Sequence, residues 1–403
     1  MKDLKHMSAI KRLNILMLYE ADISSVQLVE TVLSRDIFVL HKAVINSELI
    51  KNYSYYHMPL FIRSVDPEAV KLARKFVSES KPFVYYIDDN FWEIKGDTPL
   101  AKYYQHPIIR DGLKYIVGHA SMVLCNSIQL ADYIRERYTK RVSVVPPMFD
   151  FNLVEGVSSY DGEEIRIGFA GSSSRLKDIN FLKNVIPEIL EKYPSVVFEF
   201  AGVMPEGVQT SDRVRYFKPV SSYAEYISFQ YSRGWKIGLA PLLGSESDCY
   251  KTNNKFREYS ACYTAGIYSD SLSYKGSLID NVNGLVCYSL TPQEWLLAIS
   301  SLLDDTALRD RLAHTAHEFV KTHYDVNIIS TAWHEALLTA SNVPPKPESK
   351  IIPLVSFYKR FKWQLFLYKL RAEDVYKNRG GAGLLKHILI FLYRKIVGVH
   401  GKI

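Results

Sequence analysis

The chain has 403 residues, 47% hydrophobic and 23% charged, a balance typical of folded globular proteins and not of disordered chains. This length suggests two domains, and no run of about 18 apolar residues predicts a membrane span. Four cysteines without CxxC spacing fit a reducing, cytoplasmic environment better than a disulfide framework.

The net charge of +7 is concentrated at the C-terminal end. From Lys346 onward there are thirteen Lys or Arg and three acidic residues, so this segment carries +10 and the preceding residues carry −3. A mildly acidic body argues against a nucleic-acid-binding protein.

Residues 1–150 are predicted to form an α/β domain, because short apolar runs alternate with amphipathic helices, as in βαβ units with a parallel sheet. Acidic residues follow the apolar run 13–19 at once, so we expect a strand there and not a signal peptide. Strands are expected at residues 14–19, 38–45, 60–62, 82–87, 122–125 and 142–145. Helices are expected at residues 27–34, from 67 onward, 103–119 and 128–138.

A polar stretch, residues 151–163, is predicted to link this domain to a second α/β domain, residues 164–340. Strands are expected there at residues 165–170, 196–201, 214–217, 235–242, 267–269 and 285–288. Helices are expected at residues 179–193, 222–231, 255–264, 291–303 and 308–323. Two doubly wound domains then face each other, and ligands are expected in the cleft beyond the carboxyl ends of the strands.

The first loop of the second domain is a candidate anion site. Gly171, Ser172 and Ser173 follow a buried strand, where small residues let the backbone approach a ligand and a helix N-terminus favours phosphate. Arg175 and Lys177 add positive charge. The alternative is an ordinary loop capped by serines.

A second polar cluster opens the helix expected at residues 255–264. Lys251, Asn253, Asn254 and Lys255 offer groups that bind a diphosphate or sugar hydroxyls, and Glu258 can accept both hydroxyls of a ribose. The alternative is a solvated helix start with Glu258 exposed.

Residues 165 to about 324 resemble the nucleotide-sugar-binding domain of retaining GT-B glycosyltransferases of the family 4 type, also called glycosyl transferases group 1. The segments that carry the resemblance are IGFAGSSSRLKD, VVFEFAG, VRYFKPVSSYAEY, KIGLAPL, NNKFREYSACYTAGIYSD and NGLVC, the last followed by a TPQEW helix. The pattern is similar to a subgroup of bacterial polysaccharide, capsule and O-antigen transferases.

The resemblance implies a fold of two Rossmann-like domains and no metal or other cofactor. It implies that Glu258 binds the ribose of a nucleotide-diphosphate sugar and that Lys177 binds the diphosphate. We expect the base to lie beside Phe217 and Val220. Two positions depart from the family pattern: Tyr250 stands where a glutamate is usual, and Ser172 stands where an arginine is usual.

On the acceptor side, Asp88, Asp89 and Asn90 follow a strand whose end faces the cleft, and Arg63 follows another. Asp88 or Asp89 is expected to orient or deprotonate the acceptor hydroxyl. The alternative for the two aspartates is a strand-end turn with a helix cap. The histidines show no metal-binding spacing, which also favours a metal-free site.

The tail, residues 345–403, interleaves basic and aromatic residues, including Phe357, Phe361 and Trp363. One interpretation is a basic amphipathic segment on an anionic membrane, which would serve a lipid-linked acceptor. The other is packing on the N-terminal domain.

The sequence thus predicts a cytoplasmic hexosyltransferase, peripheral on the inner face of the membrane, that moves a sugar to a glycan or lipid-linked acceptor in bacterial surface polysaccharide synthesis. Two alternatives remain: a catalytically silent GT-B-like protein that binds glycan or partners, and a sugar-nucleotide 2-epimerase on the same fold.

Overall fold

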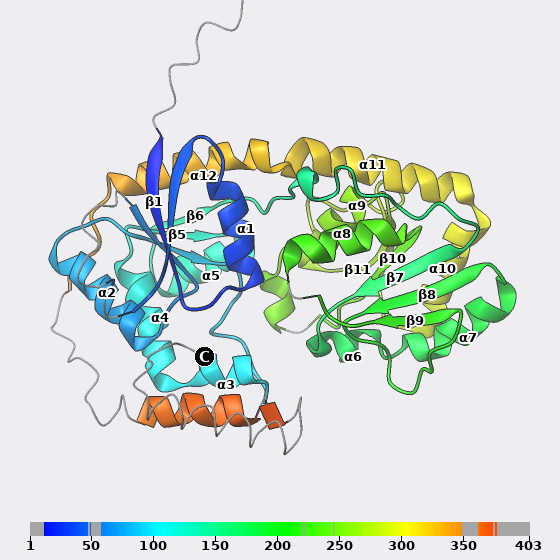
Figure 1. Ribbon diagram of the computed structural model, residues 1–403, viewed down its shortest axis with the longest axis horizontal. Helices are drawn as coiled ribbons and strands as arrows, with labels where there is room; N and C mark the ends of the chain where they lie inside the picture. The colour runs from blue at the N-terminus through cyan, green and yellow to red at the C-terminus, as the bar shows by residue number, and fades with distance from the viewer. Residues whose placement is uncertain are drawn as a thin grey trace, which may run out of the picture.

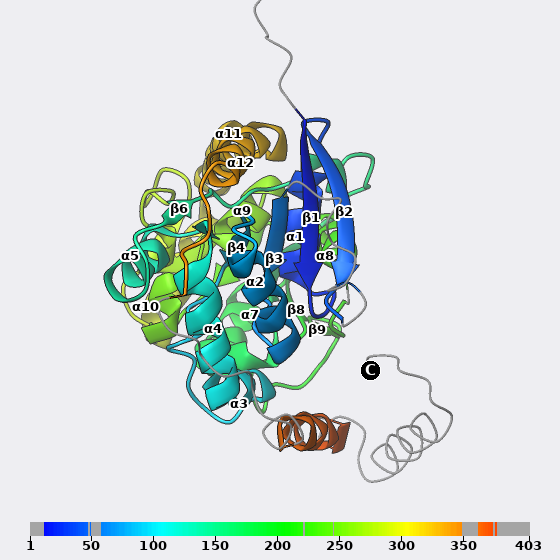
Figure 2. The ribbon, with the colours of Figure 1, turned by 90° about the vertical axis from the view of Figure 1, so that its left-hand side faces the viewer.

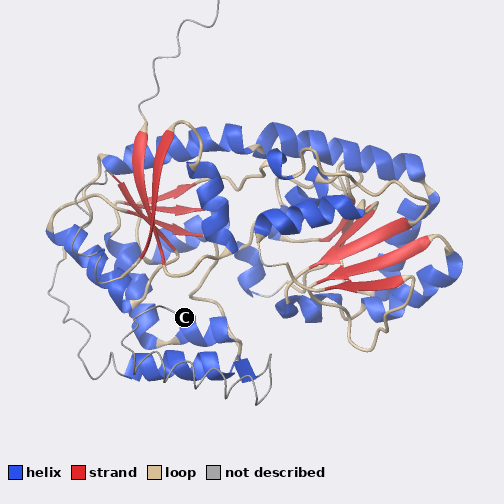
Figure 3. Ribbon diagram, viewed as in Figure 1, coloured by secondary structure: helices blue, strands red, loops and turns tan. Residues whose placement is uncertain are grey.

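The computed structural model describes residues 12–46, 49, 58–220, 222–244, 246–348, 362–373 and 375–376. Within them, two six-stranded sheets lie side by side, and helices cover their faces (Figures 1 and 3). Every strand pair in both sheets is parallel. The α/β architecture expected from the alternating pattern is therefore confirmed.

The first sheet has the order β2-β1-β3-β4-β5-β6. Its strands are β1 (Leu13–Tyr19), β2 (Phe38–Val44), β3 (Met58–Ile62), β4 (Val84–Ile87), β5 (Met122–Cys125) and β6 (Val142–Val144). Its helices are α1 (Ser24–Leu33), α2 (Pro67–Ser78), α3 (Pro99–Gln105), α4 (Pro107–His119) and α5 (Ile128–Arg137). All residues of β3 and β4 are buried, as expected for strands covered on both faces.

Local signals place two helix starts in this domain. The Asp66 carboxylate accepts a hydrogen bond from the backbone N–H of Ala69, and Pro67 occupies the first turn of α2. The single helix expected at residues 103–119 is wrong, because α3 ends before His106, whose backbone is extended. Pro107 disfavours a helical conformation at the residue before it and opens α4.

The second sheet has the order β12-β11-β10-β7-β8-β9. Its strands are β7 (Ile165–Ala170), β8 (Val196–Ala201), β9 (Val214–Phe217), β10 (Ile237–Ala240), β11 (Ala265–Ser269) and β12 (Leu285–Cys287). Its helices are α6 (Leu176–Ile179), α7 (Leu182–Lys192), α8 (Tyr223–Arg233), α9 (Asn254–Ala261), α10 (Pro292–Asp304) and α11 (Thr306–Tyr324), with short 3-10 turns η3 (Ser173–Arg175), η4 (Glu246–Tyr250) and η5 (Leu272–Tyr274). The chain direction across this sheet reverses between β7 and β10, where doubly wound folds bind ligands.

The last long helix, α12 (Val326–Ser341), crosses back to the first domain (Figures 1 and 2). Its residues Val326, Trp333 and Leu337 belong to the apolar cluster that also contains β1 and α1, and the Trp333 ring lies 5.2 Å from that of Tyr86. The sequence analysis grouped residues 326–340 with the second domain and expected no helix there. The apolar face of α12 has its partner in the first sheet instead.

The described part of the tail, a helix at residues 362–373, lies against α3 (Figures 1 and 2). Trp363 is buried, its ring 5.6 Å from Tyr103 and 4.9 Å from His106, and Lys102 pairs with Glu373 at 2.9 Å. Phe357, Phe361 and residues 377–403 lie outside the described residues. None of the described helices combines the length and apolarity that a membrane crossing requires.

Candidate active site

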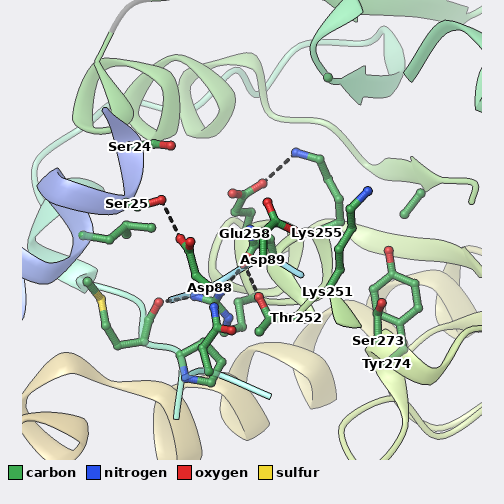
Figure 4. Close-up of a pocket in the computed structure, with 18 of the residues that line it drawn as sticks. Ser24, Ser25, Asp88, Asp89, Lys251, Thr252, Lys255, Glu258, Ser273 and Tyr274 are labelled. Atoms are coloured by element: carbon green, nitrogen blue, oxygen red, sulfur yellow. Dashed lines mark hydrogen bonds and ion pairs between the residues drawn. The ribbon is translucent and has the colours of Figure 1, made fainter. Parts of the chain in front are cut away.

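A cavity of about 340 Å³ lies between the two domains, at the carboxyl ends of their strands (Figure 4). Its walls come from both domains and combine polar side chains with apolar ones such as Val32, Met148 and Trp333. The first domain contributes Ser24, Ser25, Arg63, Asp88, Asp89 and Asn126. The second domain contributes Gly171, Ser172, Arg175, Lys251, Thr252, Asn254, Lys255, Arg257, Glu258, Ser273 and Tyr274.

Glu258 projects from α9 into this cavity although the residue is only 5% exposed. Its Oε2 accepts hydrogen bonds from Lys255 Nζ at 2.7 Å and from the Tyr226 hydroxyl at 3.1 Å. Burial and the Glu258 charge raise the pKa of Tyr226, so this phenol remains a donor. No residue in the described part of the chain hydrogen-bonds Oε1, which is therefore available to a ligand.

Two cationic side chains, Arg175 and Lys251, lie elsewhere on the second-domain wall of the cavity. Arg175 donates to Asp178 at 2.9 Å and to Asp248 at 3.3 Å, and Lys251 pairs with the same Asp248 carboxylate. Burial would lower the pKa of Arg175, but Asp178 and Asp248 raise it overall, so the guanidinium stays charged. This chain of ion pairs fixes two cations at the cavity wall, where a phosphate oxygen can meet both.

Beside these cations, two glycines let the segments that follow β7 and β8 approach each other closely. Gly171 comes directly after β7, and Gly202, with φ +88°, approaches it so closely that a Cβ on Gly202 would lie 2.3 Å from the Gly171 carbonyl oxygen. Asn253 precedes α9 without capping it by a side-chain hydrogen bond. The first N–H groups of this helix therefore add partial positive charge near Asn254 and Lys255.

The first domain presents two carboxylates at the end of β4. Asp88 accepts a hydrogen bond from Ser25 Oγ at 2.5 Å, and its other oxygen lies 3.5 Å from Arg63 Nε. Arg63 adopts a left-handed backbone, φ 54°, and its guanidinium lies 4.5 Å from the Phe91 ring centroid. Burial and the Asp88 charge raise the pKa of Asp89, although Arg63, Lys251 and Arg175 oppose this shift.

No protein-family model and no curated protein matches the sequence. Solved structures do match it. HepE from Anabaena, solved with UDP, is 14% identical with a TM-score of 0.61, over 81% of this chain and 100% of that one. A glycosyltransferase from Rickettsia africae is 11% identical with a TM-score of 0.58, over 82% and 99%. Sucrose-phosphate synthase from Thermosynechococcus elongatus is 14% identical with a TM-score of 0.55, over 80% and 98%.

The chain has the GT-B fold. The cavity occupies the cleft between the two Rossmann-like domains of this fold, and its walls bring together residues that are far apart in the sequence. The sequence-predicted residues that line it are Arg63, Asp88, Asp89, Gly171, Ser172, Arg175, Lys251, Asn254, Lys255 and Glu258.

The remaining predicted residues do not line the cavity of this GT-B cleft. Lys177 and Ser173 are exposed, while Asp178 points inward and accepts a hydrogen bond from the Leu243 N–H. Phe217 packs on Phe229, with ring centroids 5.1 Å apart. These placements favour Arg175 over Lys177 as the cation of this loop.

Three further predicted residues also lie outside the cavity lining. Asn253 is buried and donates to the Tyr324 hydroxyl at 2.9 Å, and Asn90 accepts a hydrogen bond from the Trp92 N–H at 3.2 Å. Val220 is 37% exposed. The two asparagines therefore shape the backbone on either side of the cleft and do not face its interior.

Sequence reasoning did not single out the following polar residues of the cavity wall: Ser24, Ser25, Asn126, Thr252, Arg257, Ser273 and Tyr274. A signal for the serine pair was present, because Ser24 and Ser25 follow β1 and open α1. The helix was instead expected to begin at residue 27. Arg257 gave no such signal: it donates to the Met148 carbonyl oxygen in the segment that joins the two domains.

Tyr250, which stands where the sequence resemblance would place a glutamate, does not line the cavity. Its ring packs edge-on against Tyr133 of the first domain, with centroids 5.4 Å apart, and its carbonyl oxygen accepts a hydrogen bond from Ser127 Oγ at 2.9 Å. Tyr250 therefore ties the segment that carries Lys251 to the opposite domain.

Proposed function

We propose that this chain is a glycosyltransferase that moves a sugar from a nucleotide-diphosphate sugar to a hydroxyl group of a glycan acceptor. The observation that carries the proposal is the composition of one cavity. Its second-domain wall has the Glu258 carboxylate with a free oxygen beside Arg175, Lys251 and Lys255, and its first-domain wall has Asp89. The GT-B fold supports it, and so does the complex of the similar HepE with UDP-glucose.

In this proposal Glu258 Oε1 accepts the hydroxyls of the ribose, and Lys255 keeps the carboxylate in place. The diphosphate lies against Gly171, Arg175, Lys251 and the first N–H groups of α9. As the bond from the anomeric carbon to the phosphate oxygen breaks, its electron pair stays on the diphosphate. Fixed positive groups stabilise this charge, which lowers the barrier. The acceptor oxygen bonds to the anomeric carbon and gives up its proton.

The finer features of the proposal rest on the sequence resemblance. They are retention of configuration at the anomeric carbon, independence of metal ions, hexosyl transfer and a role in bacterial surface polysaccharide synthesis. In the described residues, no group of three or more His, Cys, Asp or Glu side chains is arranged to hold a metal ion. Proton NMR of the product reads the anomeric configuration, and activity in excess chelator tests the metal independence.

A panel of sugar nucleotides tests the central proposal. Calorimetry measures nucleoside-diphosphate binding, and product formation measures transfer to glycan acceptors. Binding without transfer to any acceptor would favour the silent, glycan-binding alternative, for which the inward packing of Tyr250 is the motivating observation. Absence of binding at millimolar nucleotide would contradict the transferase proposal.

Tyr250 offers a test of how the two walls are held together. Tyr250→Ala removes an aromatic contact worth about 1 kcal/mol, so we expect kcat/KM for the sugar nucleotide to fall about 5- to 10-fold. Tyr250→Phe keeps the ring against Tyr133 and is expected to retain most of the activity. An equal loss in both variants would mean that the hydroxyl, and not the packing, is the essential feature.

We further propose that the tail brings the enzyme to an anionic membrane, where a lipid-linked acceptor would lie. Lys369 and Arg371 are exposed on the helix whose other face packs on α3. Each cation near an anionic surface contributes about 1 kcal/mol, so Lys369→Gln/Arg371→Gln is expected to weaken vesicle binding about 30-fold. Flotation with vesicles rich in phosphatidylglycerol measures this, and Lys183→Gln/Lys275→Gln is the matched control. Equal binding of both double variants would contradict the proposal.

A further inference from the structure

The two adjacent aspartates after β4 have different surroundings. Asp88 is held at one of its two oxygens: Ser25 Oγ donates to Asp88 Oδ2 at 2.5 Å, and Arg63 Nη1 donates to the same Ser25 Oγ at 2.8 Å. Asp88 Oδ1 is buried and accepts no hydrogen bond from the described residues. Arg63 Nε lies 3.5 Å from Asp88 Oδ1. These contacts join the first turn of α1 and the residues that follow β3 and β4, so they fix the end of β4 against its neighbours. Figure 4 shows the hydrogen bond between Ser25 and Asp88.

Arg63 is held in this network at a conformational cost. Its φ of 54° lies in the left-handed region, which non-glycine residues adopt at a cost of about 1–3 kcal/mol. Its backbone N–H donates to the Tyr86 carbonyl oxygen at 3.0 Å, and Phe91 supports its guanidinium. The surrounding structure therefore imposes the orientation that aims the guanidinium at Asp88.

Asp89 lines the same cavity, but its carboxylate has no hydrogen-bond partner anywhere in the described part of the chain. The charged groups that influence it are Asp88 on its own loop, Arg63 at the end of β3, and Arg175 and Lys251 across the cleft. Lys255, Arg257 and Glu258 line the farther wall. Both aspartates line the cavity, but Asp88 is anchored through Oδ2 whereas neither oxygen of Asp89 is held by a hydrogen bond from the described residues, so Asp89 is the less constrained carboxylate of the pair.

We infer that the two aspartates have different roles: Asp88 is a positioning residue fixed by Ser25 and Arg63, and Asp89 is the catalytic residue that takes the proton of the acceptor hydroxyl. This inference rests on the proposed transferase function. In the step itself, the acceptor oxygen forms its bond to the anomeric carbon, the hydroxyl proton passes to the Asp89 carboxylate, and the nucleoside diphosphate leaves with the electron pair of the broken bond.

The charges around Asp89 make the two roles separable by pH. Burial, with the neighbouring Asp88, raises the pKa of Asp89, while Arg63 acts in the opposite direction. A base is active in its ionised form, so activity falls as the pH drops through this pKa. Removing the negative charge of Asp88 lowers the pKa of Asp89, and removing the positive charge of Arg63 raises it.

The test is the pH profile of kcat/KM for the acceptor. Asp88→Asn is expected to move the acidic limb to lower pH, and Arg63→Gln is expected to move it to higher pH, each by about one unit. Asp89→Asn is expected to abolish most of the activity and leave no such limb. The surface variant Asp132→Asn, on α5, should leave the profile in place. The inference would be overturned if Asp88→Asn and Arg63→Gln moved the acidic limb in the same direction, or if neither moved it.

A second readout does not depend on turnover. Carbon-13 NMR of aspartate-labelled protein, with the Asp89 carboxyl signal assigned by its loss in Asp89→Asn, should show the same opposite displacements of the titration midpoint. An Asp89 midpoint that neither substitution moves overturns the inference even in an active enzyme. If the wild-type protein binds no nucleotide and transfers no sugar, the proposed function fails and the catalytic role of Asp89 fails with it. The NMR midpoints would still report whether Asp88 and Arg63 influence the ionisation of Asp89.

Discussion

Glu258→Gln is expected to lower kcat/KM for the sugar nucleotide by about 100-fold or more. A carboxylate accepts charge-assisted hydrogen bonds from two ribose hydroxyls, and each such bond is worth about 1.5–3 kcal/mol. Glutamine preserves the shape of the side chain but carries no charge, and with its oxygen toward the ribose its NH2 group would face two donors, Lys255 Nζ and the Tyr226 hydroxyl. It also removes the partner of Lys255, whose Nζ lies 2.7 Å from the carboxylate. Calorimetry with the nucleoside diphosphate and steady-state kinetics measure the loss of binding and turnover.

The matched control is Glu188→Gln, an exposed position on α7 that does not line the cavity. This variant is expected to bind and turn over the donor as the wild type does. Thermal unfolding of both variants distinguishes a local loss from a global one. Wild-type nucleotide affinity in a folded Glu258→Gln would mean that the ribose does not meet α9.

Local sequence signals determined much of the fold. β5, β7, β8 and β9 begin and end at the residues predicted for them, because each is a short, mostly apolar segment between polar stretches. Asp66 and Pro67 predicted the start of α2 from their own chemistry. The two-domain α/β arrangement follows from such repeated units, since parallel strands require crossover helices.

Features that depend on distant partners were not predictable in this way. α12 has an apolar stripe, but nothing in residues 326–341 indicates that β1 and α1, about 300 positions earlier, complete its packing. The contact of Tyr250 with Tyr133 of the first domain likewise joins residues more than 100 positions apart, and neither segment indicates it.

The cavity lining was predicted where residue type and position on a strand end agree, as at Asp89, Gly171 and Glu258. The lining was not predicted at positions where the direction of the side chain determines whether a residue faces the cavity. η3 and α6 together span only residues 173–179, and successive helical residues point about 100° apart. A two-residue difference therefore separates a side chain that lines the cavity, Arg175, from one that is exposed, Lys177.

Because Arg175 lines the cavity and Lys177 does not, we expect their substitutions to have different effects. Arg175→Ala is expected to lower kcat/KM for the sugar nucleotide about 100-fold, because it removes a fixed cation from the position where negative charge develops on the leaving diphosphate. Lys177→Ala is expected to change it by less than about 3-fold, because an exposed cation outside the cavity contributes only screened, long-range attraction. Each of the two variants removes one positive charge, and the two positions are close in the sequence. The difference between their kcat/KM values therefore reports the effect of the direction of the side chain.

Raising the ionic strength should distinguish the contribution of Arg175 from that of Lys177. The small effect of Lys177→Ala should vanish as ionic strength rises, whereas the Arg175→Ala defect should persist, because Arg175 is held by Asp178 and Asp248 away from bulk water. Arg175→Lys keeps the charge but loses the planar guanidinium, whose Nη1 donates to both Asp178 and Asp248, so it should recover only part of the rate. A larger loss in Lys177→Ala than in Arg175→Ala would contradict the cavity as the diphosphate site and would restore the assignment that the sequence resemblance implies.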